Sequence, residues 1–294
     1  MIEYNDFSCA RARLRQWEKC LSEIKYFLVD NGSYNPEATL SLRKVAASLS
    51  EKVGFFIRPV GLMHSHKVDS SKLLHKPAES MDALLTSDEP ENWQKVVMVP
   101  LFFGPSLAIT DWLPKKLTEW KNHGTHRNFE ILPCLHQAGD QRISKAILDY
   151  TFKMINKSKM DRPFVALVDH GTPLRSVNQI REEIGSQMKE RLKGTVKGFA
   201  TCCMERREGS EYDFNDPLLE SLIKELEEKK IKKLVLAQLF LSPGRHAGKG
   251  GDLEEICSKS SLEIDRTELL ANHPAIIEIL KDRILNSKLF ETDT

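Results

Sequence analysis

"VALVDHGTPLRS" occupies residues 165–176, and a related stretch, "YFLVDNGSYNPE", occupies residues 26–37. Both contain Leu-Val-Asp, one variable residue, Gly, and then Ser or Thr. In each case a short apolar run leads directly into residues that favour turns, which is typical of a buried strand that ends at a loop. The two stretches therefore predict equivalent strands in two parts of the chain.

A second pair of stretches supports this equivalence. "VPLFFGPS" at 99–106 is similar to "AQLFLSPG" at 237–244. Leu28 precedes Leu101 by 73 residues, and Leu167 precedes Leu239 by 72 residues, so both matches keep nearly one spacing. A shared spacing between two separate matches indicates an internal duplication.

Apolar runs alternate with amphipathic stretches in both repeats, and this alternation predicts an α/β fold with parallel strands. The expected strands are 26–30, 55–63, 95–103 and 129–133 in the first repeat, and 164–169, 196–204, 233–241 and 262–270 in the second. The expected helices are 36–52, 107–121, 139–155, 176–192, 217–230 and 274–285. We therefore expect two similar doubly wound domains, each with a flavodoxin-like parallel sheet.

The domain boundaries follow from where the repeats start and where the chain is polar. We expect a helical extension at residues 1–24, an N-terminal domain at 25–158 and a C-terminal domain at 159–294. The boundary between the domains lies within a short polar stretch before Pro163. A chain of 294 residues is long enough for two such cores.

Composition argues against several classes of partner. The chain has 43 basic and 42 acidic residues, so no bulk charge would attract nucleic acid or an anionic membrane. Its six cysteines form no C-x-x-C pair, which favours reduced thiols and a cytoplasmic location. The polar N-terminus has no signal-peptide core, and no apolar run is long enough to span a bilayer.

Three metal-binding side chains follow strands of the second repeat. His170 ends its first predicted strand, Glu205 closes its second, and His246 follows its third. The carboxyl ends of parallel strands lie at one edge of a sheet, where ligands bind, so these residues are expected to converge. Two imidazoles and a carboxylate suit a divalent first-row metal and can also accept protons near neutral pH. For each residue alone, a loop or capping role is the simpler interpretation.

The same residues resemble a known family. "LVDHGT" at 167–172, "ME" at 204–205 and "LFLSPGRHAGKGGDL" at 239–253 are similar to class II tetrapyrrole chelatases, in particular the sirohydrochlorin cobaltochelatases and ferrochelatases. The likeness covers the second repeat and, more weakly, the first. It implies a chelatase-like fold in two halves and a lyase activity that inserts Co²⁺ or Fe²⁺ into sirohydrochlorin without ATP.

The resemblance also implies roles for individual residues. His170 and His246 correspond to the family's metal-binding, proton-abstracting histidines, and Glu205 corresponds to an acidic residue near the metal. Sirohydrochlorin is a polycarboxylate, so the cleft is expected to offer cations and close backbone approach. The candidate substrate-binding residues are Gly244, Arg245, Gly248, Lys249, Arg175 and Arg206.

The first repeat departs from this pattern. Asn31 replaces His170, and the Pro-Gly-Arg-His element is replaced by Gly-Pro-Ser-Leu at 104–107, so the N-terminal half is expected to form a wall of the cleft without a metal site of its own. His64 and His66 follow a strand near the place that corresponds to Glu205. They fit either an accessory metal-delivery pair or two solvated loop histidines.

Rival functions remain open at this point. "PGRHAGKGG" fails the P-loop pattern at both ends, so no nucleotide is expected. A non-catalytic carrier of metal or tetrapyrrole would use the same cleft. A histidine phosphatase-like enzyme is a weaker alternative, because Asp169 precedes His170 where an anion-binding arginine would be needed. The sequence does not decide which metal is inserted, although Co²⁺ is favoured over Fe²⁺. It also does not decide whether the product enters cobalamin or siroheme synthesis, or whether the protein is a monomer or a homodimer.

Overall fold

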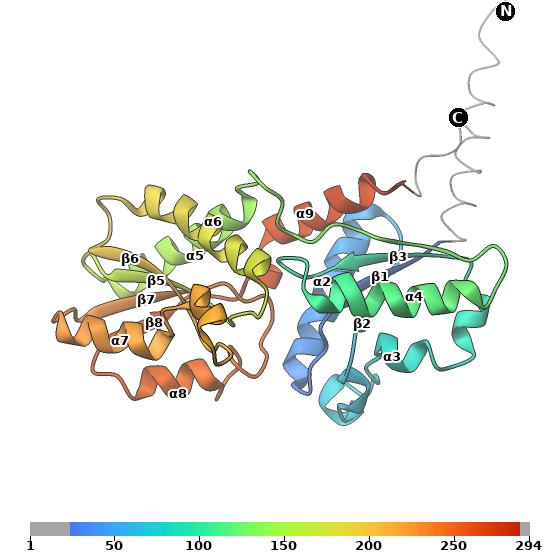
Figure 1. Cartoon of the computed structure of the whole chain (residues 1–294), viewed down its shortest axis with the longest axis horizontal. Coiled ribbons are helices and arrows are strands. Elements are labelled where there is room, and N and C mark those ends of the chain that lie inside the picture. Colours follow the sequence, from blue (N-terminus) through green and yellow to red (C-terminus); the bar gives the residue numbers. More distant parts are fainter. Residues whose placement is uncertain (1–23, 289–294) are drawn as a thin grey trace, which may run out of the picture.

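The computed structural model describes residues 24–288, which form two four-stranded parallel sheets (Figure 1). The N-terminal sheet has the order β2-β1-β3-β4, and the C-terminal sheet has the corresponding order β6-β5-β7-β8. The strands are β1 (Ile24–Asp30), β2 (Ile57–Gly61), β3 (Lys95–Pro100), β4 (Asn128–Ile131), β5 (Phe164–Asp169), β6 (Gly198–Cys203), β7 (Lys233–Gln238) and β8 (Glu263–Arg266). The shared order, which is that of flavodoxin-like sheets, confirms the prediction of two similar α/β domains.

The central strands form because their apolar runs can be covered on both faces. Leu28 and Val29 of β1 are fully buried, as are Leu167 and Val168 of β5. Parallel sheets with helices on both faces require such continuous apolar strands. The strand expected at 262–270 is shorter in the structure, where β8 runs from Glu263 to Arg266.

The helices occupy most of the predicted ranges, and α3 and α8 are additional short helices. Their bounds are α2 (Pro36–Val53), α3 (Met81–Leu84), α4 (Leu113–Asn122), α5 (Arg142–Ser158), α6 (Arg175–Leu192), α7 (Leu219–Glu228), α8 (Asp252–Ser258) and α9 (Pro274–Leu285). Local signals set the ends of α2. The Asn35 side chain accepts a hydrogen bond from the Glu37 N–H, Pro36 occupies the first turn, and Gly54 ends the helix with φ 82°.

Two helices pack on the sheet of the other repeat. α5, which follows the last strand of the first repeat, packs against β7, β8 and α6 of the C-terminal sheet (Figure 1). α9, which ends the second repeat, packs against α2 and β3 of the N-terminal sheet. The two halves therefore exchange their final helices. The boundary near residue 158, which was placed from the sequence repeats, remains a proposal about where the duplicated units meet.

The exchanged helices place one continuous apolar core between the two sheets. This core contains Leu42 of α2, Ile147 of α5, Ile184 of α6 and Leu280 of α9, together with side chains of both central strands. Separate clusters cover the outer faces of the sheets, beneath α4 in one domain and α7 in the other. The two domains are consequently held together by burial of apolar surface rather than by a linker alone.

The loops at the carboxyl ends of the strands also meet across the domain boundary. A Cβ on Gly104 would lie 2.2 Å from Cδ1 of Ile180, and one on Gly248 would lie 3.0 Å from Nδ2 of Asn35. The predicted extension at 1–24 lies outside the described residues except for Ile24, which begins β1. Among residues 24–288, no helix combines the length and apolar character needed to cross a membrane.

Candidate functional site

The loop after β5 places His170 beside the end of β6. Gly171 adopts φ 95°, a conformation that favours glycine, and turns the chain directly after His170. The Met204 N–H donates to the Asp169 carbonyl at 2.9 Å, and the Glu205 N–H donates to the His170 carbonyl at 3.1 Å. These two hydrogen bonds extend the parallel pairing by one step beyond the sheet and bring His170 and Glu205 together.

The three predicted metal ligands converge at this rim. One ligand atom from each of His170, Glu205 and His246 lies within 4.8 Å of the other two. Nε2 of His170 is 2.8 Å from Oε1 of Glu205, and the two imidazole centroids are 4.2 Å apart with an angle of 34° between the rings. The side chains of His170 and Glu205 are 52% and 59% exposed, whereas that of His246 is 15% exposed. The cluster is therefore anchored at one end and open to solvent at the other.

This arrangement suits a small divalent cation. Metal–ligand distances of about 2.0–2.2 Å for imidazole nitrogen and carboxylate oxygen bring neighbouring ligand atoms to within about 3–3.5 Å of one another. The existing separations require only small side-chain movements to reach that geometry. Three protein ligands also leave coordination positions free for a second reactant.

His246 is held by Asp252 at the start of α8. Its Nδ1 lies 2.8 Å from Oδ2 of Asp252, although the contact lacks the alignment of a good hydrogen bond. Burial lowers the pKa of His246, and the nearby His170 ring lowers it further, while Asp252 and Glu205 oppose the shift. The net lowering favours the neutral imidazole, which is the form that binds a metal or accepts a proton. Asp252 matches a carboxylate partner that orients a ligating histidine.

The predicted cations around the cluster differ in how free they are. Arg206 forms ion pairs with Asp213 and Asp216, both at 3.0 Å, so its charge is largely compensated. Arg175 stacks over the ring of Phe214, with 4.6 Å between Cζ and the ring centroid. Such stacking leaves the guanidinium edge able to bind a carboxylate.

The loop that carries His246 supplies two further cations and the predicted glycines. Arg245 is exposed and lies 3.4 Å from Asp252, and Lys249 is exposed. Gly248 has a steric requirement, because a Cβ there would lie 2.6 Å from the Gly244 carbonyl oxygen. A Cβ on Gly244 would meet no atom within 4 Å, so the packing does not require glycine at that position.

The corresponding rim of the N-terminal domain has a different set of side chains. The Met63 N–H donates to the Asn31 carbonyl, as the Glu205 N–H does to His170, so Met63 is the structural counterpart of Glu205. The segment after β3 has no structural counterpart of His246, because it enters the helical segment Ala108–Trp112, whereas the loop after β7 continues to α8 at Asp252. Asn31 and Met63 therefore replace His170 and Glu205.

This register corrects the expected position of the two N-terminal histidines. His64 lies one residue beyond the Glu205 position, adopts φ 67°, and stacks on Tyr34 with ring centroids 4.9 Å apart. His66 contacts the buried Ser80 hydroxyl through Nδ1 at 2.5 Å. His66 is therefore tied to the interior of the N-terminal domain rather than paired with His64.

The aspartate that ends the first strand of each repeat has different neighbours in the two domains. Asp30 and Asp169 end equivalent strands, and each accepts a hydrogen bond from the N–H of the glycine two residues later. Arg181 lies 3.1 Å from Asp169, whereas Leu42 occupies the equivalent helix position near Asp30. Burial raises the pKa of Asp30 from 3.8 to about 6. Burial also raises the pKa of Asp169, but the Arg181 charge opposes the shift.

We expect Asp30→Asn to stabilise the protein above pH 6. Because the folded-state pKa is raised, the contribution of Asp30 to stability is complete below about pH 3.8 and is lost as pH rises through about 6. An asparagine keeps the acceptor for Gly32 without the buried charge, so the gain at pH 8 should be on the order of 2 kcal/mol. Urea unfolding at several pH values measures this gain, which should vanish below pH 4. Asp169→Asn is the matched control and should destabilise, because it removes one of the two carboxylates that pair with the buried Arg181 and leaves only Glu182. A loss of stability for Asp30→Asn at pH 8 would contradict the argument.

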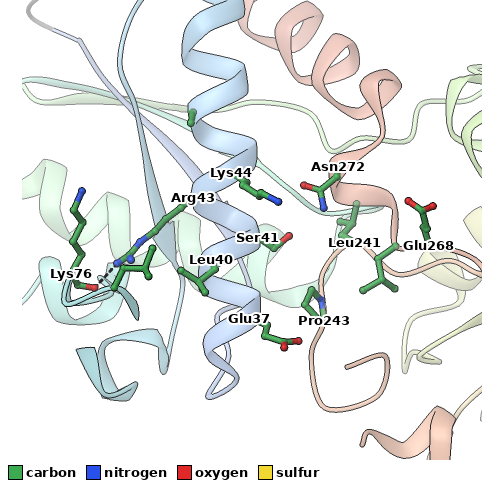
Figure 2. Close-up of a pocket in the computed structure, with 13 residues that line it drawn as sticks. Glu37, Leu40, Ser41, Arg43, Lys44, Lys76, Leu241, Pro243, Glu268 and Asn272 are labelled. Carbon is green, nitrogen blue, oxygen red and sulfur yellow. Dashed lines mark hydrogen bonds between the residues drawn. The ribbon is translucent and has the colours of Figure 1, made fainter. Parts of the chain in front are cut away.

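A large cavity lies at the seam between the domains, lined by residues of both. It has a volume of about 990 Å³, and α2 forms its floor while the loops after β7 and β8 form one wall (Figure 2). Lys44 extends from α2 toward Asn272 on that wall, and Arg43 turns the other way to the Lys76 carbonyl. The lining residues are Glu37, Leu40, Ser41, Arg43, Lys44, Ala47, Leu74, Lys76, Leu241, Pro243, Glu268, Leu269 and Asn272.

The cavity contains none of the three predicted ligands, and its lining was not predicted from the sequence. Its closest link to the cluster is Pro243, which precedes His246 by three residues and so by at most about 11 Å of backbone. The apolar and basic side chains of α2 that line the cavity have helical spacing in the sequence. Any helix on a protein surface can have this spacing, so it does not predict a cavity. Only the packing of α2 against the C-terminal domain turns this face into a cavity wall.

Comparisons with known proteins agree with this architecture. Residues 165–287 match the family model CbiX. SirB from Bacillus subtilis with Fe³⁺ is 12% identical with a TM-score of 0.60, and covers 90% of this chain and 94% of its own. SirB from Bacillus subtilis subspecies spizizenii, a sirohydrochlorin chelatase in complex with cobalt, is 11% identical with a TM-score of 0.61 and the same coverage.

A third solved structure has a similar fold. CbiX, the terminal enzyme for biosynthesis of siroheme in denitrifying bacteria, is 13% identical with a TM-score of 0.59, and covers 90% of this chain and 98% of its own. No curated protein matches the chain. At these identities the structural matches establish a shared fold, and the CbiX match falls on the domain that carries the three converging side chains. Residues 165–287 therefore match the CbiX family model, within a chain that shares the two-domain fold of the SirB and CbiX structures.

Proposed function

We propose that the protein is a sirohydrochlorin chelatase that inserts a divalent metal, Co²⁺ by preference and Fe²⁺ next, without ATP. The observation that carries this proposal is the convergence of His170, Glu205 and His246 at the open rim of the CbiX domain. The metal is a substrate in this reaction, and so the site must bind it and also release it. An exposed three-ligand site meets that requirement better than an enclosed four-ligand site.

The chemistry needs both a metal-holding group and a proton acceptor. Insertion exchanges one divalent cation for the two pyrrole N–H protons of the metal-free macrocycle. His246, neutral because burial lowers its pKa, holds the incoming ion and accepts a proton. His170 is hydrogen-bonded to the exposed Glu205, so a proton taken up at His170 has a direct route to solvent.

The cavity between the domains supports an anionic macrocycle as the second substrate. Its walls are mainly apolar, and Arg43, Lys44 and Lys76 outnumber the two carboxylates, Glu37 and Glu268, that also line it. An apolar wall with cations at its edge suits a flat ring that bears carboxylates. The shared β7 loop places this surface and His246 on one segment. Arg175, Lys249 and Arg245 extend the set of cations toward the metal cluster.

The direct test is turnover with metal-free sirohydrochlorin. Catalytic amounts of the protein should consume the metal-free absorbance in the presence of Co²⁺, more slowly with Fe²⁺ under anaerobic conditions, and ATP should have no effect. Ni²⁺ serves as a comparison, because its intrinsic affinity for nitrogen and oxygen ligands is higher than that of Co²⁺. Stoichiometric binding without turnover would favour the carrier function, and no interaction with sirohydrochlorin would overturn the proposal.

The biological setting remains a prediction. A chelatase of this kind would supply either cobalamin or siroheme synthesis in the cytoplasm. Either a monomer or a homodimer is compatible with the proposal, because both walls of the cavity come from one chain.

A further inference from the structure

Two buried polar side chains meet beneath the loops that carry His170 and Glu205. The side chain of Arg181, on α6, is 1% exposed, and Asn215, in the 3₁₀ segment Ser210–Asn215 after β6, is fully buried. A guanidinium is rarely buried to this extent unless several acceptors surround it. Nε of Arg181 pairs with the neighbouring Glu182 at 2.8 Å, and the other contacts of both side chains lead to the metal-site loops.

Arg181 connects the two loops directly. Its Nη1 donates to Oδ1 of Asp169 at 3.1 Å, and its Nη2 donates to the Asn215 carbonyl at 3.1 Å. Oδ1 of Asp169 also accepts the Gly171 N–H at 3.1 Å. One guanidinium therefore holds the residues on both sides of His170 and the far end of the loop that begins with Glu205.

Asn215 completes the connection with its side-chain amide. Its Oδ1 accepts the Thr172 N–H at 3.1 Å, and its Nδ2 donates to the Thr172 carbonyl at 2.9 Å. Nδ2 also donates to the Tyr212 carbonyl at 3.1 Å. The segment from Asp169 to Thr172 is thus fixed on both sides of His170, while the His170 side chain itself remains exposed.

The N-terminal domain makes part of this connection with other groups: Arg43 donates to the Pro77 carbonyl at 2.9 Å, and the Ser33 N–H donates to Oγ of Ser65 at 3.3 Å. Strand pairing and helix bounds place Leu42 at the Arg181 position, and Leu42 is buried in the apolar core. The bridge partners Ser80 and Leu218 are equivalent, which places Pro77 at the Asn215 position. Both repeats build a four-stranded sheet with a strand-end aspartate bonded to a glycine N–H. Among the described residues, no guanidinium bonds Asp30, so the bond from Arg181 to the strand-end aspartate is the part of the network that the fold of a repeat does not need.

The bond from a buried guanidinium to the strand-end aspartate is present in the repeat that has the metal-binding side chains, and the described residues of the other repeat do not form it. Burying an arginine carries a desolvation penalty, which Asp169 and Glu182 offset by pairing with Arg181. Because Asp169 directly precedes His170, this pairing acts on the loop that carries a metal-binding side chain.

We propose that Arg181 and Asn215 are positioning residues that hold His170 at the distance from Glu205 that a metal ion requires. This inference rests on the proposed metal site, and it concerns affinity for the ion before any reaction with a tetrapyrrole. Groups that orient metal ligands typically change metal affinity by about 10- to 100-fold when they are lost.

The test is Co²⁺ binding by the full chain, measured from the visible absorption of the bound ion. Arg181→Leu, which reproduces the N-terminal residue, is expected to weaken Co²⁺ binding about 10- to 100-fold, and Asn215→Ala should weaken it in the same direction. Arg181→Lys should recover part of the affinity, because a lysine can still bond Asp169. In turnover, the KM for the metal should rise while the KM for sirohydrochlorin stays unchanged.

Arg283→Leu is the matched control for loss of a buried arginine. Arg283 is 6% exposed and donates to the carbonyls of Cys134 and Leu135, on the N-terminal side of the molecule. The Arg283→Leu substitution should lower the melting temperature of the protein without changing its affinity for Co²⁺. If Arg181→Leu does not fold, Asn215→Ala and Arg181→Lys decide the question. Folded variants that bind Co²⁺ as tightly as the wild type would overturn the inference alone, whereas a wild type that binds no Co²⁺ would overturn the proposed function with it.

Discussion

His246→Ala is expected to reduce metal insertion by about 10²- to 10⁴-fold, the range typical of losing a group that transfers protons in the reaction. His246 is the most buried member of the cluster and is held by Asp252, and no other side chain among residues 24–288 is positioned to replace it. Co²⁺ binding should weaken as well, because one of three ligands is removed. His170→Ala should act in the same direction, and it also leaves Glu205 without its 2.8 Å partner.

The N-terminal repeat provides the control for this experiment. Asn31 stands at the position equivalent to His170, in a loop with the same backbone hydrogen bonds. Asn31→Ala should therefore change the rate of insertion by no more than a few-fold. Initial rates with Co²⁺ and metal-free sirohydrochlorin measure all three variants. Wild-type rates in both histidine variants would refute their assigned roles, and a large loss in Asn31→Ala would mean that the N-terminal rim takes part.

The sequence was sufficient for the architecture because its signal was repeated. The stretches at 26–37 and 165–176 each combine a buried strand with a turn, and their matched spacing to the next strand predicted two equivalent sheets. The convergence of His170, Glu205 and His246 followed from one topological rule, since parallel strands present their carboxyl ends at one edge. No side-chain detail was needed for that step.

Details of packing could not be predicted in the same way. α5 and α9 each have an apolar face, but such a face does not specify which of two similar sheets it covers, so the helix exchange was not foreseen. His64 and His66 were placed only near the position that corresponds to Glu205, because the pattern of a strand does not mark the residue at which pairing ends. In the structure that position is occupied by Met63.

The partners of charged residues could not be predicted for a related reason. Arg206 was expected to bind substrate, and in the structure it forms ion pairs with Asp213 and Asp216. Arg181 lies in an amphipathic helix where an arginine ordinarily faces solvent, and its partners are the adjacent Glu182 together with Asp169 and Asn215 from distant parts of the chain. Pairing of this kind is a property of the folded structure, which a single sequence does not reveal.

Gly171→Ala is expected to remove metal binding and to destabilise the protein by about 3 kcal/mol. An added Cβ would lie 1.9 Å from the Glu205 carbonyl oxygen, far inside van der Waals contact, in a residue with φ 95°. The loop can relieve this clash only by moving away from the end of β6, which breaks the hydrogen bond between the Glu205 N–H and the His170 carbonyl. The ligands on either side of that bond would then separate.

Gly32→Ala distinguishes the effect on the site from the effect on the fold. Gly32 has φ 79°, and a Cβ there would lie 1.7 Å from the Met63 carbonyl oxygen, so the strain in the N-terminal repeat is similar. Urea unfolding should therefore give similar losses of stability for the two variants. Co²⁺ titration of the folded fraction should differ, with binding retained in Gly32→Ala and lost in Gly171→Ala. Equal loss of Co²⁺ binding in both variants would contradict this, because it would show that the ion responds to general destabilisation and not to the spacing of His170 and Glu205.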